Sequence, residues 1–461
     1  MVSMKLKGGS FVILLKNIGY LVQKANKVIE NVDLLVVGNR IKKIGRCAIE
    51  GTNPDIKIID ATGKIVIPGL VNTHTHLYQN MLKGIRDDLR LKEWCEQVTF
   101  PFSHIIHQEH RQHDNIELGY YYAALGALEM VRSGITSFVD MDITLDSIFE
   151  AWSQIGVRAT GALQTVNRWV PKILMQPEEK KKQELLGYIE KWHNNGILKV
   201  ALAPSTPFAC TPDYLNWLKQ VALDYGQLPI YVHVSETRWE VEQSLSEFGM
   251  TPLVYLDSID FLSIPICAVH CVHLTEEEIA LAKEKDVTVI YNPKSNAKLG
   301  SGVAPVVTYL KEGIPVTLAT DGAASNDLLD IFEEMRFGAM IQKAIWADPA
   351  VISAADMFKM ATEAGAKMLD IDAGVLEEGK LADLVILNPD LAHIQPIHDL
   401  IQSLVYCGKA SDVETVIIDG KIVLEDKKFC TVDEKKILQR AVELGTEKFV
   451  EAKDYEMAAD F

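Results

Sequence analysis

The sequence is poor in cysteine and has no long apolar run. Its seven cysteines are an odd number among 461 residues, and no Cys-x-x-Cys pair occurs. This usage indicates reduced thiols in a cytoplasmic protein and argues against a disulfide framework or a zinc ribbon. The apolar run at residues 11–15 is too short for a signal peptide, and no segment reaches the ~18 apolar residues that a membrane span needs. We therefore expect a cytoplasmic protein with no membrane partner.

Positive charge is also scarce. Lysine and arginine number 46 against 63 aspartate and glutamate residues, which gives a formal net charge of −17. Such a balance disfavours nucleic acid or an anionic membrane surface as a partner. The chain is 48% hydrophobic and 24% charged, which is typical of a globular protein with a sizeable core.

Several motifs of common enzyme classes are missing. No G-x-x-x-x-G-K-[ST] and no G-x-G-x-x-G occurs, so a cradle for nucleotide phosphates is not supported. The zinc-site motif H-E-x-x-H is absent as well. An H-x-E triplet exists at His107-Gln108-Glu109, but the P-C-x-x-C that cytidine deaminases pair with it does not. Ser295 and Lys298 match S-x-x-K without its companion motifs, which indicates coincidence.

The pattern of apolar residues changes twice along the chain. The first sixty or so residues, and those after 373, consist of short strand-like runs separated by turns. Between them, continuous apolar runs alternate with longer helical stretches, which indicates parallel strands buried on both faces. Eight such runs are found, at residues 69–76, 134–141, 157–164, 198–205, 228–236, 265–273, 287–295 and 314–322.

Eight strand–helix units in about 300 residues predict an α/β fold, a (β/α)₈ TIM-type barrel. A doubly wound open sheet is the alternative, although it would more often have five to seven strands. We predict that residues 67–372 form the barrel and that it is inserted in a small β-sandwich built from residues 1–66 and 373–430. A capping-box spacing from Thr431 to Glu434 predicts a last helix near 432–453, within a helical tail at 431–461.

Residues suited to bind a metal stand at the ends of four predicted strands. The active sites of barrel enzymes lie at these carboxyl ends. A lone buried histidine is more often a hydrogen-bonded core residue, so the inference rests on the whole set. Three imidazoles and a carboxylate suit Zn²⁺, Fe²⁺ or Mn²⁺. The set comprises His74, His76, His233, Glu236, His270 and Asp321.

A second group of histidines is interpreted differently. His104, His107, His110 and His113 recur every third residue, and on a helix such a stripe turns by ~60° per step. Only two adjacent members could then share a ligand. The polar surroundings of the run predict a solvated surface.

The strand-end motifs resemble those of a known family. The segments "PGLVNTHTH", "HVSE", "HCVHL", "NPKSNAKLGSGVAPV", "TDGAASN" and "EEGKLADLVIL" are similar to the amidohydrolase superfamily. More narrowly, they resemble its metal-dependent aminohydrolases: methylthioadenosine/S-adenosylhomocysteine deaminases, with guanine, cytosine and triazine deaminases as relatives. The resemblance runs along nearly the whole chain.

The resemblance implies roles for these residues. His74, His76, His233 and Asp321 would ligate one divalent metal, zinc first, with Fe²⁺ or Mn²⁺ as alternatives. Glu236 would be the proton shuttle. His270 and Asp321 would take the proton of an attacking water molecule, so the implied catalytic residues are Glu236, His270 and Asp321.

The resemblance also bears on the substrate. Adenosine-type deaminases have a purine-contacting histidine where this chain has Ser205. Glu93 matches a family glutamate that binds ribose hydroxyls, and Arg168 would stand in for a substrate arginine. We predict a hydrolase of C–N bonds in cyclic amidines that deaminates a thioether adenosine of the S-adenosylhomocysteine or methylthioadenosine type.

Alternatives remain open on the sequence alone. One is a deaminase or hydrolase of a compact ring, such as a triazine, pterin, guanine or cytosine. Another is a dehalogenase-like or amide-cleaving enzyme with the same site, and a third is a non-catalytic metal-binding barrel. The expected partners are a small amino-heterocycle and water, and a homo-oligomer is expected.

Overall fold

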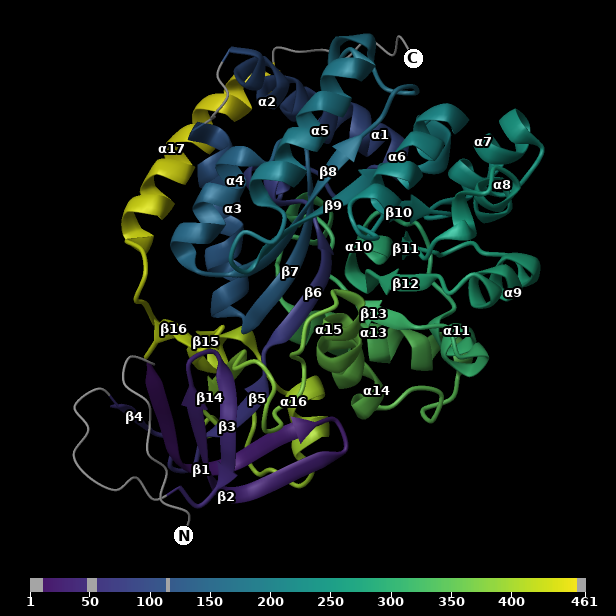
Figure 1. Ribbon diagram of the computed structural model, residues 1–461. Helices are drawn as coiled ribbons and strands as arrows, with labels where there is room; N and C mark the ends of the chain where they lie inside the picture. The colour runs from purple at the N-terminus through teal and green to yellow at the C-terminus, as the bar shows by residue number, and fades with distance from the viewer. Residues whose placement is uncertain (1–10, 48–55, 113–116, 454–461) are drawn as a thin grey trace.

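The computed structural model describes residues 11–47, 56–112 and 117–453, and Figure 1 shows its arrangement. Eight parallel strands lie in the middle of the chain, which confirms the eight strands predicted there. Their bounds are β6 Leu70–Thr75, β7 Ile135–Asp142, β8 Arg158–Thr165, β9 Leu198–Pro204, β10 Tyr231–Val234, β11 Cys267–His270, β12 Thr288–Tyr291 and β13 Val316–Leu318.

These strands form two four-stranded sheets, β6-β7-β8-β9 and β10-β11-β12-β13. A parallel bridge between Leu202 and Ile230 connects the first sheet with the second. At the other side, the backbone N–H of Asp321 donates to the carbonyl of His74 at 3.1 Å. The ends of β6 and β13 therefore lie side by side, and their carboxyl ends meet at one place.

Helices connect the strands and surround them (Figure 1). Between β6 and β7 the chain forms α1 Leu91–Trp94, α2 Phe100–Gln112 and α3 Glu117–Arg132. The later ones are α4 Asp146–Ile155, α5 Glu178–Trp192, α6 Pro212–Asp224, α7 Arg238–Phe248, α8 Pro252–Ser258, α9 Glu276–Glu284, α10 Pro293–Lys298, α11 Val306–Glu312, α12 Ala323–Asn326, α13 Ile331–Trp346, α14 Ala354–Lys359, α15 Gly365–Met368 and α16 Leu400–Tyr406. Among the described helices, none combines the length and the apolar composition required to cross a membrane.

Strands from both ends of the chain make one nine-stranded sheet. The antiparallel pairing of β5 with β14 joins the two contributions. This sheet has an apolar core of its own, in which Ile13, Leu34, Leu384 and Ile417 are buried. The strands are β1 Val12–Lys24, β2 Lys27–Val37, β3 Arg40–Gly45, β4 Ile56–Asp60, β5 Ile65–Pro68, β14 Leu384–Leu387, β15 Val413–Ile418, β16 Lys421–Glu425 and β17 Lys428–Phe429.

The last helix, α17, covers Glu434–Lys453, which agrees with the helix predicted near 432–453. It packs against α2 and α3. Arg440 on α17 forms a 2.8 Å ion pair with Glu117 at the start of α3. The helix thus lies across the outside of the segment that follows the first parallel strand.

Candidate active site

Five side chains converge where the parallel strands end. The ring centres of His74 and His76 lie 4.7 Å apart, those of His74 and His233 5.1 Å, and those of His233 and His270 5.4 Å. Asp321 places its Oδ1 3.4 Å from Nε2 of His74 and 3.6 Å from Nε2 of His76. The structure therefore brings together five of the six residues that the sequence placed at these strand ends, and the sixth, Glu236, lies beside His270.

The donor atoms have the spacing and the chemistry that a metal requires. Ligand atoms of His74, His233 and His270 lie within 4.8 Å of one another, and so do those of His74, His76 and Asp321. His74 is fully buried, yet neither of its ring nitrogens has a hydrogen-bond partner within the described part of the chain. An unpaired buried polar group is costly, and a cation bound to the ring would remove that cost. The site therefore fits a divalent metal.

Backbone carbonyls orient two of the imidazoles. Nδ1 of His76 lies 2.7 Å from the carbonyl oxygen of Met141, and Nδ1 of His233 lies 2.6 Å from that of Ser205. A carbonyl only accepts a hydrogen bond, so the proton of each neutral ring is on Nδ1. Each Nε2 then presents its lone pair to the cluster, which is the usual arrangement of metal-bound histidines.

Two members of the cluster have an unusual backbone conformation. His270 has φ of 72° and Asp321 has φ of 62°, although neither is glycine. Such residues cost of order 1–3 kcal/mol each and are concentrated at functional sites. Asn292 and Asn296 flank the ring of His270, with Oδ1 of Asn296 2.8 Å from its Nδ1.

Asp321 is held as an anion. Burial by itself would raise the pKa of Asp321, but the neighbouring His74 and His270 keep it well below its ordinary value. The hydroxyl of Ser295 donates to Oδ2 at 2.6 Å, and the backbone N–H of Gly322 donates to Oδ1 at 2.7 Å. A fixed carboxylate of this kind can ligate a cation and accept a proton.

Glu236 differs from Asp321 in its protonation. It follows β10 and is 3% exposed. Burial, together with the charge of Asp321, raises the pKa of Glu236 to about 8. Its Oε1 accepts from the Ser301 hydroxyl at 3.0 Å, and its Oε2 lies 3.4 Å from Nε2 of His270. At neutral pH it is therefore an acid with a proton to donate, next to the candidate metal ligands.

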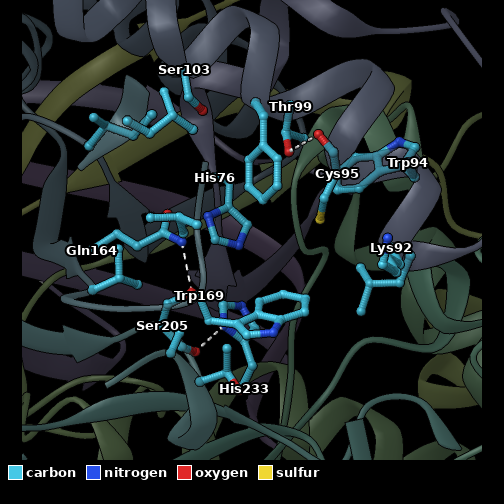
Figure 2. A pocket seen from close by; sticks show the side chains of 18 of the residues that line it. His76, Lys92, Trp94, Cys95, Thr99, Ser103, Gln164, Trp169, Ser205 and His233 are labelled. Atoms are coloured by element: carbon cyan, nitrogen blue, oxygen red, sulfur yellow. Dashed lines mark hydrogen bonds between the residues drawn. The ribbon is translucent and has the colours of Figure 1, made fainter. Parts of the chain in front are cut away.

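The cluster opens into a pocket of about 190 Å³. One wall is aromatic: the rings of Trp169, Phe208 and Trp239 pack together with centre-to-centre distances of 4.8 to 5.6 Å. Figure 2 shows the Trp169 indole on the side of the pocket where Ser205 and His233 lie. Trp169 has φ of 58°, an uncommon conformation for a bulky residue.

The three predicted substrate residues are placed differently. Ser205 lines the pocket, and its hydroxyl accepts from the Gln164 amide at 2.9 Å (Figure 2). Glu93 is exposed, and it does not line the pocket although its neighbours Lys92 and Trp94 do. Arg168 forms an ion pair with Glu247, away from the pocket lining. Of the three, Ser205 is the residue that lines the pocket.

The interpretation of the histidine run as a solvated surface is wrong. His104 is buried, His107 lines the pocket, and His110 contacts Glu184 with both side chains nearly covered. The physical reason is that α2 is enclosed by α17 and by the segment around α5, where Gln176 contacts His107 and Glu184 contacts His110. His113 lies outside the described residues.

Sequence reasoning also missed groups that line the pocket. Gln79, three residues after His76, is 3% exposed, and its Oε1 has no hydrogen-bond partner among the residues described. A Cβ on Gly322 would lie 2.0 Å from that oxygen, so a larger residue at this position would displace the Gln79 amide. Because Gln79 follows the predicted ligand His76 by only three residues, the sequence could have indicated that it lies near the site. No comparable signal exists for Trp169, Phe208 or Trp239, because three segments that are separate in the sequence bring these rings together.

Comparison with known proteins places the chain among hydrolases. The family model described as "Amidohydrolase family" matches residues 65–423. The chain is 40% identical over 413 residues to a 5′-deoxyadenosine deaminase of Methanocaldococcus jannaschii, covering 89% of this chain and 95% of that protein. It is 38% identical over 437 residues to a 5-methylthioadenosine/S-adenosylhomocysteine deaminase of Thermoanaerobacter pseudethanolicus, covering 92% and 96%.

Solved structures agree at the level of the fold. An adenosine deaminase from Xanthomonas campestris with bound zinc superposes with a TM-score of 0.86 at 27% identity, covering 95% of this chain and 98% of that one. A triazine hydrolase from Arthrobacter aurescens superposes with a TM-score of 0.85 at 24% identity, covering 94% and 99%. The mixed α/β architecture is thus that of a TIM-barrel fold with a sheet domain. The family model spans most of the chain, and relatives of about 40% identity cover nine tenths of it, so this chain belongs to the amidohydrolase family.

Proposed function

We propose that the protein is a metal-dependent aminohydrolase that removes the amino group of an adenosine bearing a 5′-deoxy or 5′-thioether substituent and releases ammonia. The observation that supports this most directly is the pairing of a buried, protonated Glu236 with a cluster of imidazoles and a carboxylate. A site that only bound a metal for stability would need no such acid. The names of the curated relatives point to the same class of substrate.

The proposed metal ligands are His74, His76, His233 and Asp321, around one divalent metal. Zinc is the first choice because the fold neighbour from Xanthomonas is a zinc protein, and Fe²⁺ and Mn²⁺ are the alternatives. When bound, the metal would lower the pKa of a water molecule and so supply hydroxide near neutral pH.

The chain's own residues would move the protons. Asp321 and His270 accept a proton from the attacking water. Glu236 donates its proton to the ring nitrogen beside the carbon that carries the amino group, which prevents a full negative charge on the ring. As the new C–O bond forms, the amino group takes up the proton that Asp321 and His270 accepted from the water. The C–N bond then breaks, ammonia leaves, and the proton of the new hydroxyl group returns to Glu236. The 3.4 Å separation of Glu236 and His270 would let a proton pass between them.

A compact ring is the second candidate substrate, and two observations favour it. By the resemblance, Ser205 stands where adenosine-type deaminases have a purine-contacting histidine. Glu93, the predicted ribose ligand, is exposed and does not line the pocket. A site that binds a ribose through a polar group should strongly reject substrates that lack one.

An ammonia-release screen separates the two candidates. The panel is 5′-deoxyadenosine, methylthioadenosine, S-adenosylhomocysteine, adenine, guanine and an aminotriazine. We expect turnover of the 5′-substituted adenosines and at least ~10²-fold lower kcat/KM for free adenine. Preferential turnover of guanine or the triazine would replace our proposal with the compact-ring one.

We also propose the finer architecture that the sequence predicted. The two four-stranded sheets would close into one (β/α)₈ barrel over residues 67–372, inserted in a β-sandwich of residues 1–66 and 373–430, with the tail at 431–461. An apolar cluster with members from both four-stranded sheets, including Val71, Ala162, Tyr231 and Ile290, supports a common interior. A cytoplasmic homo-oligomer remains part of this proposal, and light scattering of the purified protein would measure the assembly.

A further inference from the structure

A buried glutamate lies outside the pocket and has no part in the proposed mechanism. Glu334 on α13 is fully buried and does not line the pocket. Glutamate is almost never fully buried unless its carboxyl group is paired. Here both oxygens have partners: Oε1 accepts from the side-chain amide of Asn326 at 2.6 Å, and Oε2 accepts from the backbone N–H of Lys294 at 3.3 Å. That N–H is in the first turn of α10 and has no acceptor within its own helix. One side chain thus connects α13 to the segments that follow β12 and β13.

These two segments also contain the hydroxyl groups around Asp321. Ser295 is the residue after Lys294, and its hydroxyl donates to Oδ2 of Asp321 at 2.6 Å. Ser325 is the residue before Asn326, and its hydroxyl lies 3.2 Å from the same oxygen and 2.9 Å from that of Ser295. The residue next to each contact of the buried glutamate therefore holds the carboxylate of the candidate metal ligand.

A third contact reaches the backbone of Asp321. The amide nitrogen of Asn326, which donates to Glu334, also donates to the carbonyl oxygen of Thr320 at 2.5 Å. Thr320 directly precedes Asp321, whose φ of 62° is an unfavourable conformation that persists only where the surroundings hold it. Glu334 fixes this amide from the other side, so its contacts bear on both the side chain and the backbone of Asp321.

We infer that Glu334 is a positioning residue, which fixes Asp321 for metal binding and proton transfer through the segments that follow β12 and β13. The inference rests on the proposed function, because it takes Asp321 as a metal ligand. Loss of Glu334 would leave the Lys294 N–H and the Asn326 amide without this acceptor in a buried place, so we expect both segments to rearrange. Groups that orient metal ligands typically account for about 10- to 100-fold in metal affinity or activity.

The zinc affinity of the purified protein tests this inference. Glu334→Leu removes both acceptor oxygens. The zinc dissociation constant, measured by competition with a chromophoric chelator, should rise about 10- to 100-fold. At saturating zinc, kcat for the best substrate of the ammonia-release screen should fall about tenfold or more, because Asp321 is misplaced. KM should stay within about threefold of the wild-type value, because Glu334 does not line the pocket.

Glu278→Leu is the matched control. Glu278 on α9 is also fully buried, and its two oxygens accept from the backbone N–H groups of Leu253 and Thr275, each at 3.0 Å. Its loss should lower the denaturant midpoint about as much as the loss of Glu334, yet leave the zinc dissociation constant within about threefold of the wild-type value. Unchanged zinc affinity in Glu334→Leu, or equal weakening in both variants, would overturn the inference.

A second variant decides the question if Glu334→Leu does not fold. Asn326→Ala removes the amide that joins Glu334 to the Thr320 carbonyl, and it should raise the zinc dissociation constant about tenfold. Wild-type zinc affinity in Asn326→Ala would rule out the proposed connection. A wild-type protein that binds zinc but releases no ammonia would overturn the proposed function, while the zinc affinities of the variants still decide the inference. A wild-type protein that binds no zinc would overturn both.

Discussion

At the scale of single residues, two carboxyl groups in one site have opposite protonation. Asp321 lies among imidazoles that stabilise its charge, whereas burial and the charge of Asp321 favour the protonated form of Glu236. Environments that push two pKa values apart assign an acid and a base. The sequence was sufficient to predict that both residues lie at strand ends. Their protonation states depend on burial and on neighbouring charges, which the spacing of residues in the sequence does not reveal.

The role of Glu236 can be separated from metal binding. Glu236→Gln keeps the shape of the side chain but cannot donate and regain a proton. We expect kcat to fall by at least ~10²-fold while metal content, measured by elemental analysis, stays at about one per chain. His74→Ala is the matched control, since it should lose both metal and activity. Loss of metal in Glu236→Gln would make Glu236 a ligand instead.

The proton of Glu236 should also appear in the pH profile. The acid must be protonated to act, and its pKa is raised to about 8, so activity should be constant at neutral pH and fall as the pH rises through that value. The Ser301 hydroxyl favours the ionised form. Ser301→Ala should therefore move the falling limb to higher pH. If activity in Ser301→Ala falls at the same pH as in the wild type, or at a lower pH, this assignment is wrong.

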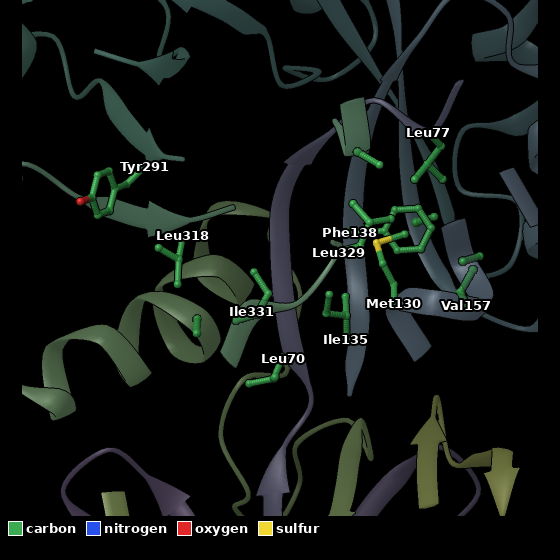
Figure 3. Packing of buried hydrophobic residues seen from close by; sticks show 14 of the residues in the cluster. Leu70, Leu77, Met130, Ile135, Phe138, Val157, Tyr291, Leu318, Leu329 and Ile331 are labelled. Carbon is green, nitrogen blue, oxygen red and sulfur yellow. The ribbon is translucent and has the colours of Figure 1, made fainter. Parts of the chain in front are cut away.

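At the scale of elements, the parallel strands were predictable because their apolar runs are continuous. Figure 3 shows Leu70, Ile135 and Leu318, from three of them, in the packed core. The alternation of side chains along a strand also explains why His74 and His76, two residues apart, share a site. The burial of α2 was not predictable, because it depends on α17, more than 300 residues later, and on Gln176 and Glu184 near α5. The loops that hold Trp169 and Phe208 are likewise ordered by distant contacts.

The start of α7 should matter for activity as well as stability. Thr237 caps this helix directly after Glu236, in a capping box with Glu240. We expect Thr237→Ala to lower the free energy of unfolding by ~1 kcal/mol and to lower kcat, because the position of Glu236 loosens. Thr275→Ala removes the equivalent cap of α9 and should cost similar stability without an effect on kcat. Equal kcat in both variants would show that the cap does not position Glu236.

At the scale of the whole molecule, one arginine joins the parallel strands to the nine-stranded sheet. Arg158 begins β8, and its guanidinium binds Asp383 at 2.8 Å and Asp419 at 3.1 Å. Asp383 precedes β14 and Asp419 follows β15. The arginine and Asp383 are largely buried, at 12% and 1% side-chain exposure. These ion pairs therefore connect the parallel strands to the nine-stranded sheet through largely buried charges.

Removing that arginine should destabilise the whole protein. Arg158→Met leaves a buried carboxylate without its partner, which typically costs 3–5 kcal/mol, and we expect a correspondingly lower denaturant midpoint. Arg132→Met removes an exposed pair with Glu434, at 38% and 32% exposure, and should cost ~1 kcal/mol or less. Similar denaturant midpoints for the two variants would mean that the buried network contributes no more to the free energy of unfolding than a surface ion pair does.

The nine-stranded sheet has a consequence for how the protein is made. Strand β5 leaves the ribosome early, but its partner β14 is synthesised roughly 300 residues later, a delay of about 15–60 s at ordinary elongation rates. During that interval the apolar face formed by Ile13, Leu34 and their neighbours lacks Leu384 and Ile417, which later help to cover it. Nascent chains halted before residue 384 should therefore bind chaperones and be cut by protease within the N-terminal strands, and release of the full chain should end both.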